Sequence, residues 1–437
     1  TVGATFADQN VDTGIVVTVN SITLSDGDNG GLATNYTIST GQTTTADITA
    51  KTLTATASAS NKVYDGTTTA AATLTFSGLV GSETLGQTVG ATFADQNVDT
   101  GIVVTVNSIT LSDGDNGGLA TNYTISTGQT TTADITAKTL TATASASNKV
   151  YDGTTTAAAT LTFSGLVGSE TLGQTVGATF ADQNVDTGIV VTVNSITLSD
   201  GDNGGLATNY TISTGQTTTA DITAKTLTAT ASASNKVYDG TTTAAATLTF
   251  SGLVGSETLG QTVGATFADQ NVDTGIVVTV NSITLSDGDN GGLATNYTIS
   301  TGQTTTADIT AKTLTATASA SNKVYDGTTT AAATLTFSGL VGSETLGQTV
   351  GATFADQNVD TGIVVTVNSI TLSDGDNGGL ATNYTISTGQ TTTADITAKT
   401  LTATASASNK VYDGTTTAAA TLTFSGLVGS ETLGQTV

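Results

Sequence analysis

The acidic loop Ser25-Asp26-Gly27-Asp28-Asn29-Gly30-Gly31 holds the residues of this chain that are best suited to bind a metal ion. Calcium prefers about six to eight oxygen ligands, and carboxylate and amide oxygens at alternate positions could supply several of them while the glycines let the chain wrap. The EF-hand spacing is incomplete, because no Glu follows at the twelfth position. Asp, Asn and Gly are also the usual residues of a tight turn with positive φ. A calcium site and a structural turn are therefore both open.

The same loop occurs four more times along the chain, so a calcium site would recur with it. Calcium is the only cofactor that the residues suggest. Asp47 lies near a boundary between domains, where it could join acids of the following domain in a further cation site. The candidate calcium ligands are Asp26, Asp28 and Asn29 with their equivalents Asp113, Asp115, Asp200, Asp202, Asp287, Asp289, Asp374 and Asp376.

Two further motifs have both a structural and a functional interpretation. In Tyr64-Asp65-Gly66 the Asp-Gly pair is expected to close a turn, with the tyrosine packed inward and its hydroxyl at the rim. The alternative is a tyrosine platform on which a carbohydrate stacks. Asn35-Tyr36-Thr37 is an N-glycosylation sequon, but it lies on a predicted strand, so its role could be structural. The sequon asparagines are Asn35, Asn122, Asn209, Asn296 and Asn383.

The chain is poor in catalytic groups. It has no His and no Cys, so a general base or nucleophile would have to be a carboxylate or a hydroxyl. Paired carboxylates for glycoside hydrolysis remain possible by count alone. Lys51 and Lys62 are the only amines of the repeating unit, and an intramolecular isopeptide bond to an Asn is conceivable, although both lysines lie beside predicted strand ends where solvent exposure is expected. We predict that the chain is not an enzyme.

All these residues belong to one 87-residue unit that is repeated five times without change and followed by two further residues. Solenoid repeats are about 20–50 residues long, because each is a single supersecondary unit. A unit of 87 residues is instead the size of a small independent domain. A series of five identical active sites has no evident use, whereas a fibre, a stalk or a multivalent surface needs repetition. The repeat therefore predicts a tandem array in which each unit has its own fold.

The composition excludes several partners. The net charge of −25 comes from 35 acids against 10 lysines, and such a chain repels nucleic acid and anionic membranes. No run approaches the length of about 18 apolar residues that a membrane helix needs. We therefore expect neither nucleic acid nor membrane as a partner of this segment. The absence of Cys excludes disulfides and thiolate metal sites but does not fix the compartment.

The local pattern is that of β-strands throughout the unit. Apolar and hydroxyl residues alternate at 52–59, 72–76 and 15–24, and shorter runs occur at 36–38 and 46–48. Turn residues separate these runs, and six or seven short strands at this spacing predict an all-β fold, an immunoglobulin (Ig)-like β-sandwich for each repeat. The expected core residues are Phe6, Val17, Val19, Ile22, Leu24, Tyr36, Ile38, Ile48, Leu53, Val63, Tyr64, Leu74, Phe76 and Leu79.

Several motifs resemble those of a known family. Lys62-Val63-Tyr64-Asp65-Gly66-Thr67-Thr68 is similar to the motif that names the YDG repeat of very large bacterial surface adhesins. Phe6-Ala7-Asp8-Gln9-Asn10-Val11, Asn35-Tyr36-Thr37-Ile38 and Ala46-Asp47-Ile48-Thr49-Ala50-Lys51-Thr52-Leu53 extend the resemblance over the whole unit. It implies Ig-like repeats in filamentous haemagglutinin-like surface proteins, and it brings no catalytic residues. The chain departs from the family at Ala50, where Pro is frequent, and in its longer acidic loop.

The same motif order places the domain boundary near Ala50 and Lys51. The expected divisions are a partial repeat at 1–50, complete repeats at 51–137, 138–224, 225–311 and 312–398, and a partial repeat at 399–437. The two partial repeats are the back and the front of one domain, so the chain looks like a window cut from a longer array. An alternative is that neighbouring chains complete a composite domain between them.

Two functions are compatible with this organisation. The first is a structural stalk or extracellular filament on a bacterial cell surface, an extended rod whose length is set by the number of repeats. Its partners would be neighbouring repeats and like chains in a fibre. The second is a multivalent adhesin in which each repeat weakly binds a host or substratum glycan. Each unit has only four aromatic residues, and its core needs most of them, which favours the stalk.

Overall fold

Alternating hydroxyl and apolar residues form the strands of the computed structural model, which describes residues 1–436. In β5 (Thr54–Ala59) each alanine is half-buried, while the Thr and Ser residues between them are exposed. The described part of the chain contains strands and 3-10 turns but no α-helix. Consequently none of its helices has the length and apolar character needed to cross a membrane.

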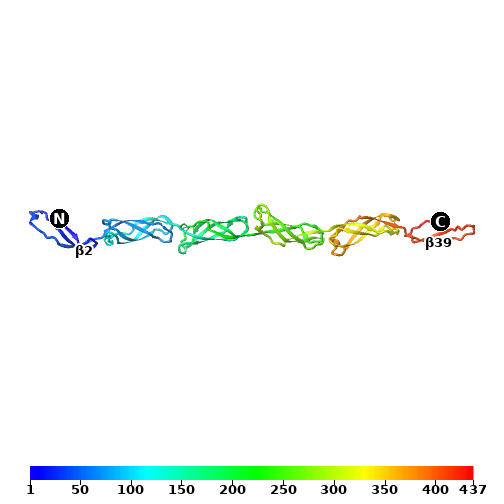
Figure 1. The fold of residues 1–437 in the computed structure, drawn as a ribbon, viewed down its shortest axis with the longest axis horizontal. Coiled ribbons are helices and arrows are strands. Elements are labelled where there is room, and N and C mark those ends of the chain that lie inside the picture. The colour runs from blue at the N-terminus through cyan, green and yellow to red at the C-terminus, as the bar shows by residue number, and fades with distance from the viewer. Residues whose placement is uncertain (437) are drawn as a thin grey trace. The chain divides into compact units, whose positions relative to one another are not determined.

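The chain divides into two compact parts, the first covering residues 1–223 and the second beginning at residue 224. Figure 1 shows that the strands of each complete repeat gather with others of the same repeat. The first complete repeat, 51–137, consists of β4 (Lys51–Thr52), β5, β6 (Lys62–Val63), β7 (Thr69–Ala70), β8 (Ala72–Ser77), β9 (Leu85–Phe93), β10 (Asp99–Asp113), η2 (Ala120–Asn122), β11 (Tyr123–Thr124) and β12 (Thr130–Thr136).

The strands of this repeat form two groups. The larger is a five-stranded sheet of order β6-β12-β10-β9-β7, in which only the edge strand β6 runs parallel to its neighbour. In the smaller group β5 pairs antiparallel with β8, and β4 pairs in parallel with β11. In the last complete repeat the equivalents of β4 and β5 are one continuous strand, which unites the smaller group into a three-stranded sheet.

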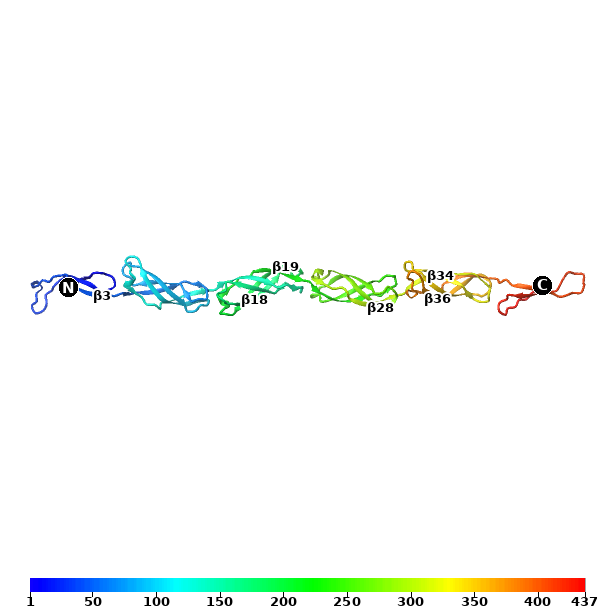
Figure 2. The same ribbon diagram turned by 90° about the horizontal axis from the view of Figure 1, so that it is seen from below.

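The same elements recur 87 residues apart. The rest of the first part contains β13 (Lys138–Thr139), β14 (Thr141–Ala146), β15 (Lys149–Val150), β16 (Thr156–Ala157), β17 (Ala159–Ser164), β18 (Leu172–Phe180), β19 (Asp186–Asp200), η3 (Ala207–Asn209), β20 (Tyr210–Thr211) and β21 (Thr217–Thr223), preceded in the partial repeat by β1 (Val2–Phe6), β2 (Asp12–Ile22), η1 (Ala33–Asn35) and β3 (Thr43–Ile48). Figure 2 shows the antiparallel pair of β18 and β19.

The second part repeats this order. Its elements are β22 (Lys225–Thr226), β23 (Thr228–Ala233), β24 (Lys236–Val237), β25 (Thr243–Ala244), β26 (Ala246–Ser251), β27 (Leu259–Phe267), β28 (Asp273–Asp287), η4 (Ala294–Asn296), β29 (Tyr297–Thr298), β30 (Thr304–Thr310), β31 (Lys312–Ala320), β32 (Lys323–Val324), β33 (Thr330–Ala331), β34 (Ala333–Ser338), β35 (Leu346–Phe354), β36 (Asp360–Asp374), η5 (Ala381–Asn383), β37 (Tyr384–Ile386), β38 (Thr391–Thr397), β39 (Thr402–Ala407) and β40 (Ala420–Ser425).

Both groups of strands contribute to one core in the repeats 51–137, 225–311 and 312–398. In the last one, Leu335 of the three-stranded sheet lies in the same buried cluster as Phe354, Val365 and Ile396 of the five-stranded sheet. Alanines of β31 pack against this cluster, so small side chains let the two sheets approach. The alternation seen in the sequence therefore produces a shared apolar interior and an exposed outer face rich in Thr and Ser.

A glutamine side chain joins the two groups at one edge. The Gln87 side chain accepts a hydrogen bond from the Leu74 N–H at 2.9 Å and donates one to the Leu74 carbonyl at 2.8 Å. These bonds satisfy backbone groups on the side of β8 that faces away from β5, which would otherwise be an unpaired sheet edge.

Every predicted strand occurs in the complete repeats, but 36–38 itself forms no strand, and the expected core needs corrections. Val63 is 56% exposed, because β6 is a two-residue edge strand in which alternation turns Val63 outward while Tyr64 is buried. Ile15, which is not among the expected core residues, is only 8% exposed, and its equivalent Ile102 is buried as well. The long strand β9 was also not expected, since glycines interrupt its apolar pattern.

Candidate functional site at the joint between repeats

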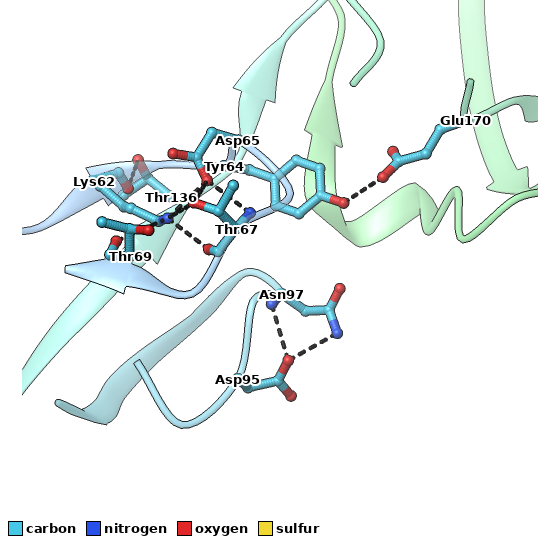
Figure 3. A network of polar contacts seen from close by, with 9 residues as sticks. All are labelled: Lys62, Tyr64, Asp65, Thr67, Thr69, Asp95, Asn97, Thr136 and Glu170. Atoms are coloured by element: carbon cyan, nitrogen blue, oxygen red, sulfur yellow. Dashed lines mark hydrogen bonds and ion pairs between the residues drawn. The ribbon is translucent and has the colours of Figure 1, made fainter. Parts of the chain in front are cut away.

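The Tyr-Asp-Gly motif forms a turn that one lysine holds together. The Lys62 Nζ lies 2.7 Å from Asp65 Oδ1 and 2.6 Å from the Thr67 carbonyl oxygen, and it also contacts the Thr67 hydroxyl and the Thr69 carbonyl (Figure 3). The same Asp65 oxygen accepts hydrogen bonds from the Thr67 N–H and hydroxyl at 2.9 and 2.8 Å. Lys62 thus closes the turn as an internal cation.

The electrostatics of this turn follow from its burial. The Lys62 side chain is only 17% exposed, and its Nζ lies 5.6 Å from the centre of the Phe93 ring. Burial of Asp65 would raise its pKa, but the hydrogen bonds from Lys62 and Thr67 outweigh this and leave the pKa below its ordinary value. The prediction that Lys62 is exposed is therefore wrong. Its hydrogen-bond partners among the described residues are Asp and Thr oxygens, which provides no support for an isopeptide bond to Asn.

The Tyr64 side chain packs in the core of its own repeat and also contacts the next repeat. Its side chain is 1% exposed, and its hydroxyl donates to Glu170 Oε1 at 2.6 Å (Figure 3). The other oxygen of Glu170 accepts a hydrogen bond from the hydroxyl of Tyr210, so one carboxylate joins the tyrosines of two repeats. The two rings meet edge to face with centroids 5.5 Å apart. The set of Tyr64, Glu170 and Tyr210, with Asn97, Val98 and Asn209 beside them and Gly66 against Val167, is called the joint.

The joint raises the pKa of both tyrosines. For Tyr210, burial and the hydrogen bond to the Glu170 carboxylate raise the pKa to about 12. Burial makes the largest contribution to a raised pKa of Tyr64, and the hydrogen bond to Glu170 makes the next largest. The neutral phenols are favoured because ionisation would place a second anion beside a carboxylate in a poorly solvated site. Both hydroxyls therefore remain donors well above neutral pH.

A second group of contacts lies beside the tyrosines. The Val98 N–H donates to the side-chain oxygen of Asn209 at 2.9 Å, and Asn209 Nδ2 donates to Asn97 Oδ1 at the same distance. Asp95 holds Asn97 in place by accepting hydrogen bonds from its backbone and side chain (Figure 3). Asn209 has no exposed surface. A buried amide with paired donor and acceptor fixes the relative position of the segments it joins.

Gly66 allows the two repeats to approach closely. Its φ is +74°, and a Cβ at this position would lie 2.8 Å from Val167 Cγ1 of the next repeat. The motif thus needs Gly for its left-handed backbone and for the contact across the joint.

The second part of the chain contains the same joint between 225–311 and 312–398. Glu344 accepts hydrogen bonds from the hydroxyls of Tyr238 at 2.6 Å and Tyr384 at 2.5 Å. Asn383 accepts from the Val272 N–H at 2.9 Å and donates to Asn271 at 3.0 Å. The joint is therefore a reproducible property of the repeat.

The acidic loop folds as a turn on its own repeat. Asp113 Oδ1 accepts the Ala120 N–H at 2.7 Å, the Asp115 N–H donates to the Thr84 hydroxyl at 2.8 Å, and Asn116 Nδ2 donates to the Ser82 carbonyl at 3.0 Å. Asn116 has a φ of +58°, as the turn interpretation requires. No cluster of three or more His, Cys, Asp or Glu able to hold a metal occurs within residues 1–436. The calcium site stays a prediction.

Two other expected site residues have structural partners. Asp134, the equivalent of Asp47, accepts hydrogen bonds from Gly101 and from the Asn61 side chain of its own repeat. The sequon residue Asn122 lies at the end of the 3-10 turn η2, not on a strand as predicted. Its equivalent Asn209 uses its amide nitrogen inside the joint, so a glycan there would require these contacts to open. Tyr64 exposes no ring face on which a sugar could stack.

Sequence reasoning missed the two polar residues that complete the joint. Glu83, the equivalent of Glu170, contributes only to the count of acids, and Asn10, the equivalent of Asn97, stands only within a motif. The signal that could have identified the glutamate is its residue type, because it is the only Glu among the seven acids of the repeat.

Comparison with known families agrees with this organisation. The family model of the YDG domain matches residues 49–133, 136–220, 223–307 and 310–394, at the same 87-residue spacing. These matches begin two residues before the boundaries predicted above. No curated protein matches the chain in sequence.

Proposed function

We propose, from the premise that the chain belongs to the YDG domain family, that it is a structural stalk segment of a bacterial surface protein. In this proposal each repeat is an Ig-like β-sandwich, and the joints keep successive repeats in a fixed orientation. The segment serves as a spacer whose length depends on the number of repeats, and it acts outside the cell in a filamentous adhesin or a similar protein.

The joint is the observation that carries the proposal. The tyrosine that defines the motif is buried against the next repeat, where a carboxylate and a second tyrosine bind it. A residue used for ligand binding would need an accessible ring face or hydroxyl. A buried polar network with matched partners instead supports one defined arrangement of the two repeats. Such an arrangement is what a stalk needs in order to transmit force and hold its length.

The use of the aromatic residues favours a stalk over a multivalent adhesin. In the first complete repeat Tyr64, Phe93 and Tyr123 are buried, and Phe76 packs against the core. No aromatic side chain is left to form an exposed binding patch on this repeat. Weak glycan binding repeated along an array usually depends on such exposed surfaces.

A distance measurement across one joint tests the proposal. The chain has no cysteine, so spin labels can be placed at Thr56→Cys and Thr143→Cys, two exposed strand positions in consecutive repeats. We expect a narrow distance distribution that broadens in Glu170→Ala, because this variant removes the carboxylate between the two repeats. An equally broad distribution in both proteins would overturn the proposal of a fixed joint.

The matched control is Glu83→Ala in the same labelled chain. Glu83 is chemically identical to Glu170, but its carboxylate accepts the hydroxyl of Tyr123 within one repeat and has no bond across the labelled joint. The distance distribution should therefore stay narrow in this variant.

A further inference from the structure

In each complete repeat an early strand runs parallel to the strand that ends the repeat. In 51–137 these are β6 and β12, in which Lys62 lies opposite Ile135 and Val63 opposite Thr136. We propose that this pair is a shear clamp, through which a repeat resists unfolding when the chain is pulled at its two ends. Such a clamp deepens the proposed function, on which it rests, because a stalk transmits force along its length.

The direction of the two strands decides how tension acts on the bonds between them. β6 comes early in the repeat and β12 ends it, so the pull acts on the N-terminal end of one strand and on the C-terminal end of the other. In a parallel pair these two ends lie at opposite ends of the ladder. The strands must therefore slide past each other, and all the bonds between them bear the load together.

The same pair is the direct link between the beginning and the end of the repeat. The strands that precede β6 are β4, which pairs with β11, and β5, which pairs with β8, and neither partner ends the repeat. Among the described strand pairs of 51–137, only β6 and β12 join an early strand to the last one. If β4 and β5 detach under load, the repeat stays closed until this pair separates.

Further hydrogen bonds extend the short ladder at both of its ends. Asn61 Oδ1 accepts the Asp134 N–H at 2.8 Å, and Asn61 Nδ2 donates to Asp134 Oδ2 at 3.1 Å. The Tyr64 N–H donates to the Thr136 carbonyl at 2.9 Å. The Thr136 hydroxyl donates to the Lys62 carbonyl at 3.2 Å (Figure 3). Each of these bonds joins the early segment of the repeat to its last strand, so they would share the load with the ladder.

Both strands are anchored in the body of the repeat. Tyr64, which follows β6, is buried in the core, and the Lys62 ammonium group bonds the Thr69 carbonyl of β7 at 3.2 Å. In β12 the side chains of Ala133 and Ile135 are buried in the same core. Because these side chains keep either strand from peeling away alone, a load at the two ends of the repeat acts on the bonds that join the strands.

The same arrangement occurs in the other complete repeats. The strand pairs β15–β21, β24–β30 and β32–β38 are parallel and have the same register as β6–β12. Each is extended by the same amide and carboxylate, in the pairs Asn148 with Asp221, Asn235 with Asp308, and Asn322 with Asp395. A chain under tension opens first at its weakest repeat, so equal clamps in all repeats are what a load-bearing array needs.

Single-molecule force spectroscopy of the full chain, held by its two ends at constant force, tests the proposal. Asn148→Ala removes both side-chain bonds to Asp221 in one repeat and leaves the other repeats as references in the same recording. Unfolding of one 87-residue repeat should release about 300 Å of extended chain, less the length of the folded repeat. We expect one event in each recording to become roughly tenfold faster, because two of the bonds that must break together are lost.

The matched control is Asn194→Ala in the same repeat. Asn194 is exposed like Asn148, but its amide donates to Thr179 Oγ1 at 2.9 Å between the antiparallel strands β18 and β19, neither of which ends the repeat. The control should unfold under force at the wild-type rate. Urea unfolding measures the free energy that each variant loses, so the two rates can be compared for the same loss. Equal acceleration on that basis, or no acceleration in Asn148→Ala, would overturn the proposal.

A change in the direction of pulling gives an independent test. The chain has no cysteine, so handles can be attached at the exposed positions Ser147→Cys and Thr219→Cys. Both lie at the same end of the β15–β21 pair, in which Lys149 is opposite Ile222, so the bonds would open one after another.

Pulled at these handles, the repeat should unfold at a severalfold lower force than when the chain is pulled at its two ends. The same force in both directions would contradict the clamp. These measurements concern single repeats, so their failure is distinct from a failure of the fixed joint, which the distance measurement across the joint reports.

Discussion

Removal of one hydroxyl at the joint should weaken the coupling between two repeats without changing either repeat alone. The perturbation is Tyr238→Phe. Its hydroxyl donates to Glu344 across the joint, while the other oxygen of Glu344 keeps its hydrogen bond from Tyr384 within its own repeat. The variant therefore deletes the hydrogen bond from Tyr238 to Glu344, while the bonds of Asn383 to Val272 and Asn271 still cross the joint.

The expected magnitude follows from burial and charge. Tyr238 is 1% exposed, and its acceptor is a carboxylate. A hydrogen bond to a charged group contributes about 1.5–3 kcal/mol to stability. The phenyl ring still fills the same space, so no cavity adds to the loss. We expect a decrease of about 2 kcal/mol in the free energy that couples the two repeats.

Glu344→Ala should cost more. It leaves the hydroxyls of both Tyr238 and Tyr384 without their acceptor, although Tyr384 still receives the Val341 N–H at 2.9 Å. We expect about 3–5 kcal/mol for this variant, as two buried donors lose their partner. Ser232→Ala is the matched control, because its exposed hydroxyl bonds Thr247 within one repeat, and it should change the stability by less than about 0.5 kcal/mol.

Urea unfolding followed by circular dichroism measures the effect. In a tandem array the stability is a sum of repeat terms and nearest-neighbour terms, and a global fit separates them. With a slope of about 1 kcal/mol/M for a unit of this size, Tyr238→Phe should lower the midpoint of the affected step by on the order of 1–2 M. A midpoint equal to that of the wild type, or a loss found only in the repeat terms, would refute the reasoning.

Three further predictions concern the joint and the turn that supports it. Thermal stability should fall as the pH rises from about 10 to 12, because folding raises the pKa of Tyr210 to about 12. In this window the folded chain retains a proton that the unfolded chain has released. A melting temperature that does not change over this pH range at constant salt would contradict the prediction. In chemical denaturation Gly66→Ala should lower the unfolding free energy more than Gly101→Ala does. Both positions have a similar positive φ, but only the first would place a Cβ against Val167. Equal decreases in unfolding free energy would argue against close contact at the joint. Lys62→Met should cost about 1–3 kcal/mol of unfolding free energy, whereas Lys51→Met at an exposed position should cost less than about 0.5 kcal/mol; similar values for both would show that the Lys62 contacts do not stabilise the turn.

The sequence predicts the strands because their causes are local. Alternation between Thr and Ala in β5, and the β-branched run in β10, specify strand and exposed face within a few residues. The turn at Asn116 could also be predicted, since a positive φ next to glycines favours Asn. The exposure of Val63 could not, because it depends on how few residues of β6 pair with the neighbouring strand.

The joint could not be predicted from the sequence for a different reason. Tyr64 could meet Glu83 of its own repeat or Glu170 of the next, and in an exact repeat the two pairings have the same residue types and the same local sequence. Only the distance between the two ends of the folded repeat decides between them. The same ambiguity applies to Asn97 and Asn209. In an exact repeat, the sequence pattern alone therefore cannot distinguish a contact between repeats from a contact within one repeat.

Small-angle X-ray scattering of the four complete repeats, 51–398, tests most directly the claim that the joints make this segment a stalk. The measurement is made in calcium and then in chelator. A strand as long as β9 spans about 30 Å, so four repeats joined end to end should reach a maximum dimension on the order of 120–160 Å. We predict an extended, stiff particle in both conditions, with direct contacts at the joints holding the repeats. A compact particle, or a rod that becomes flexible when calcium is removed, would contradict the account.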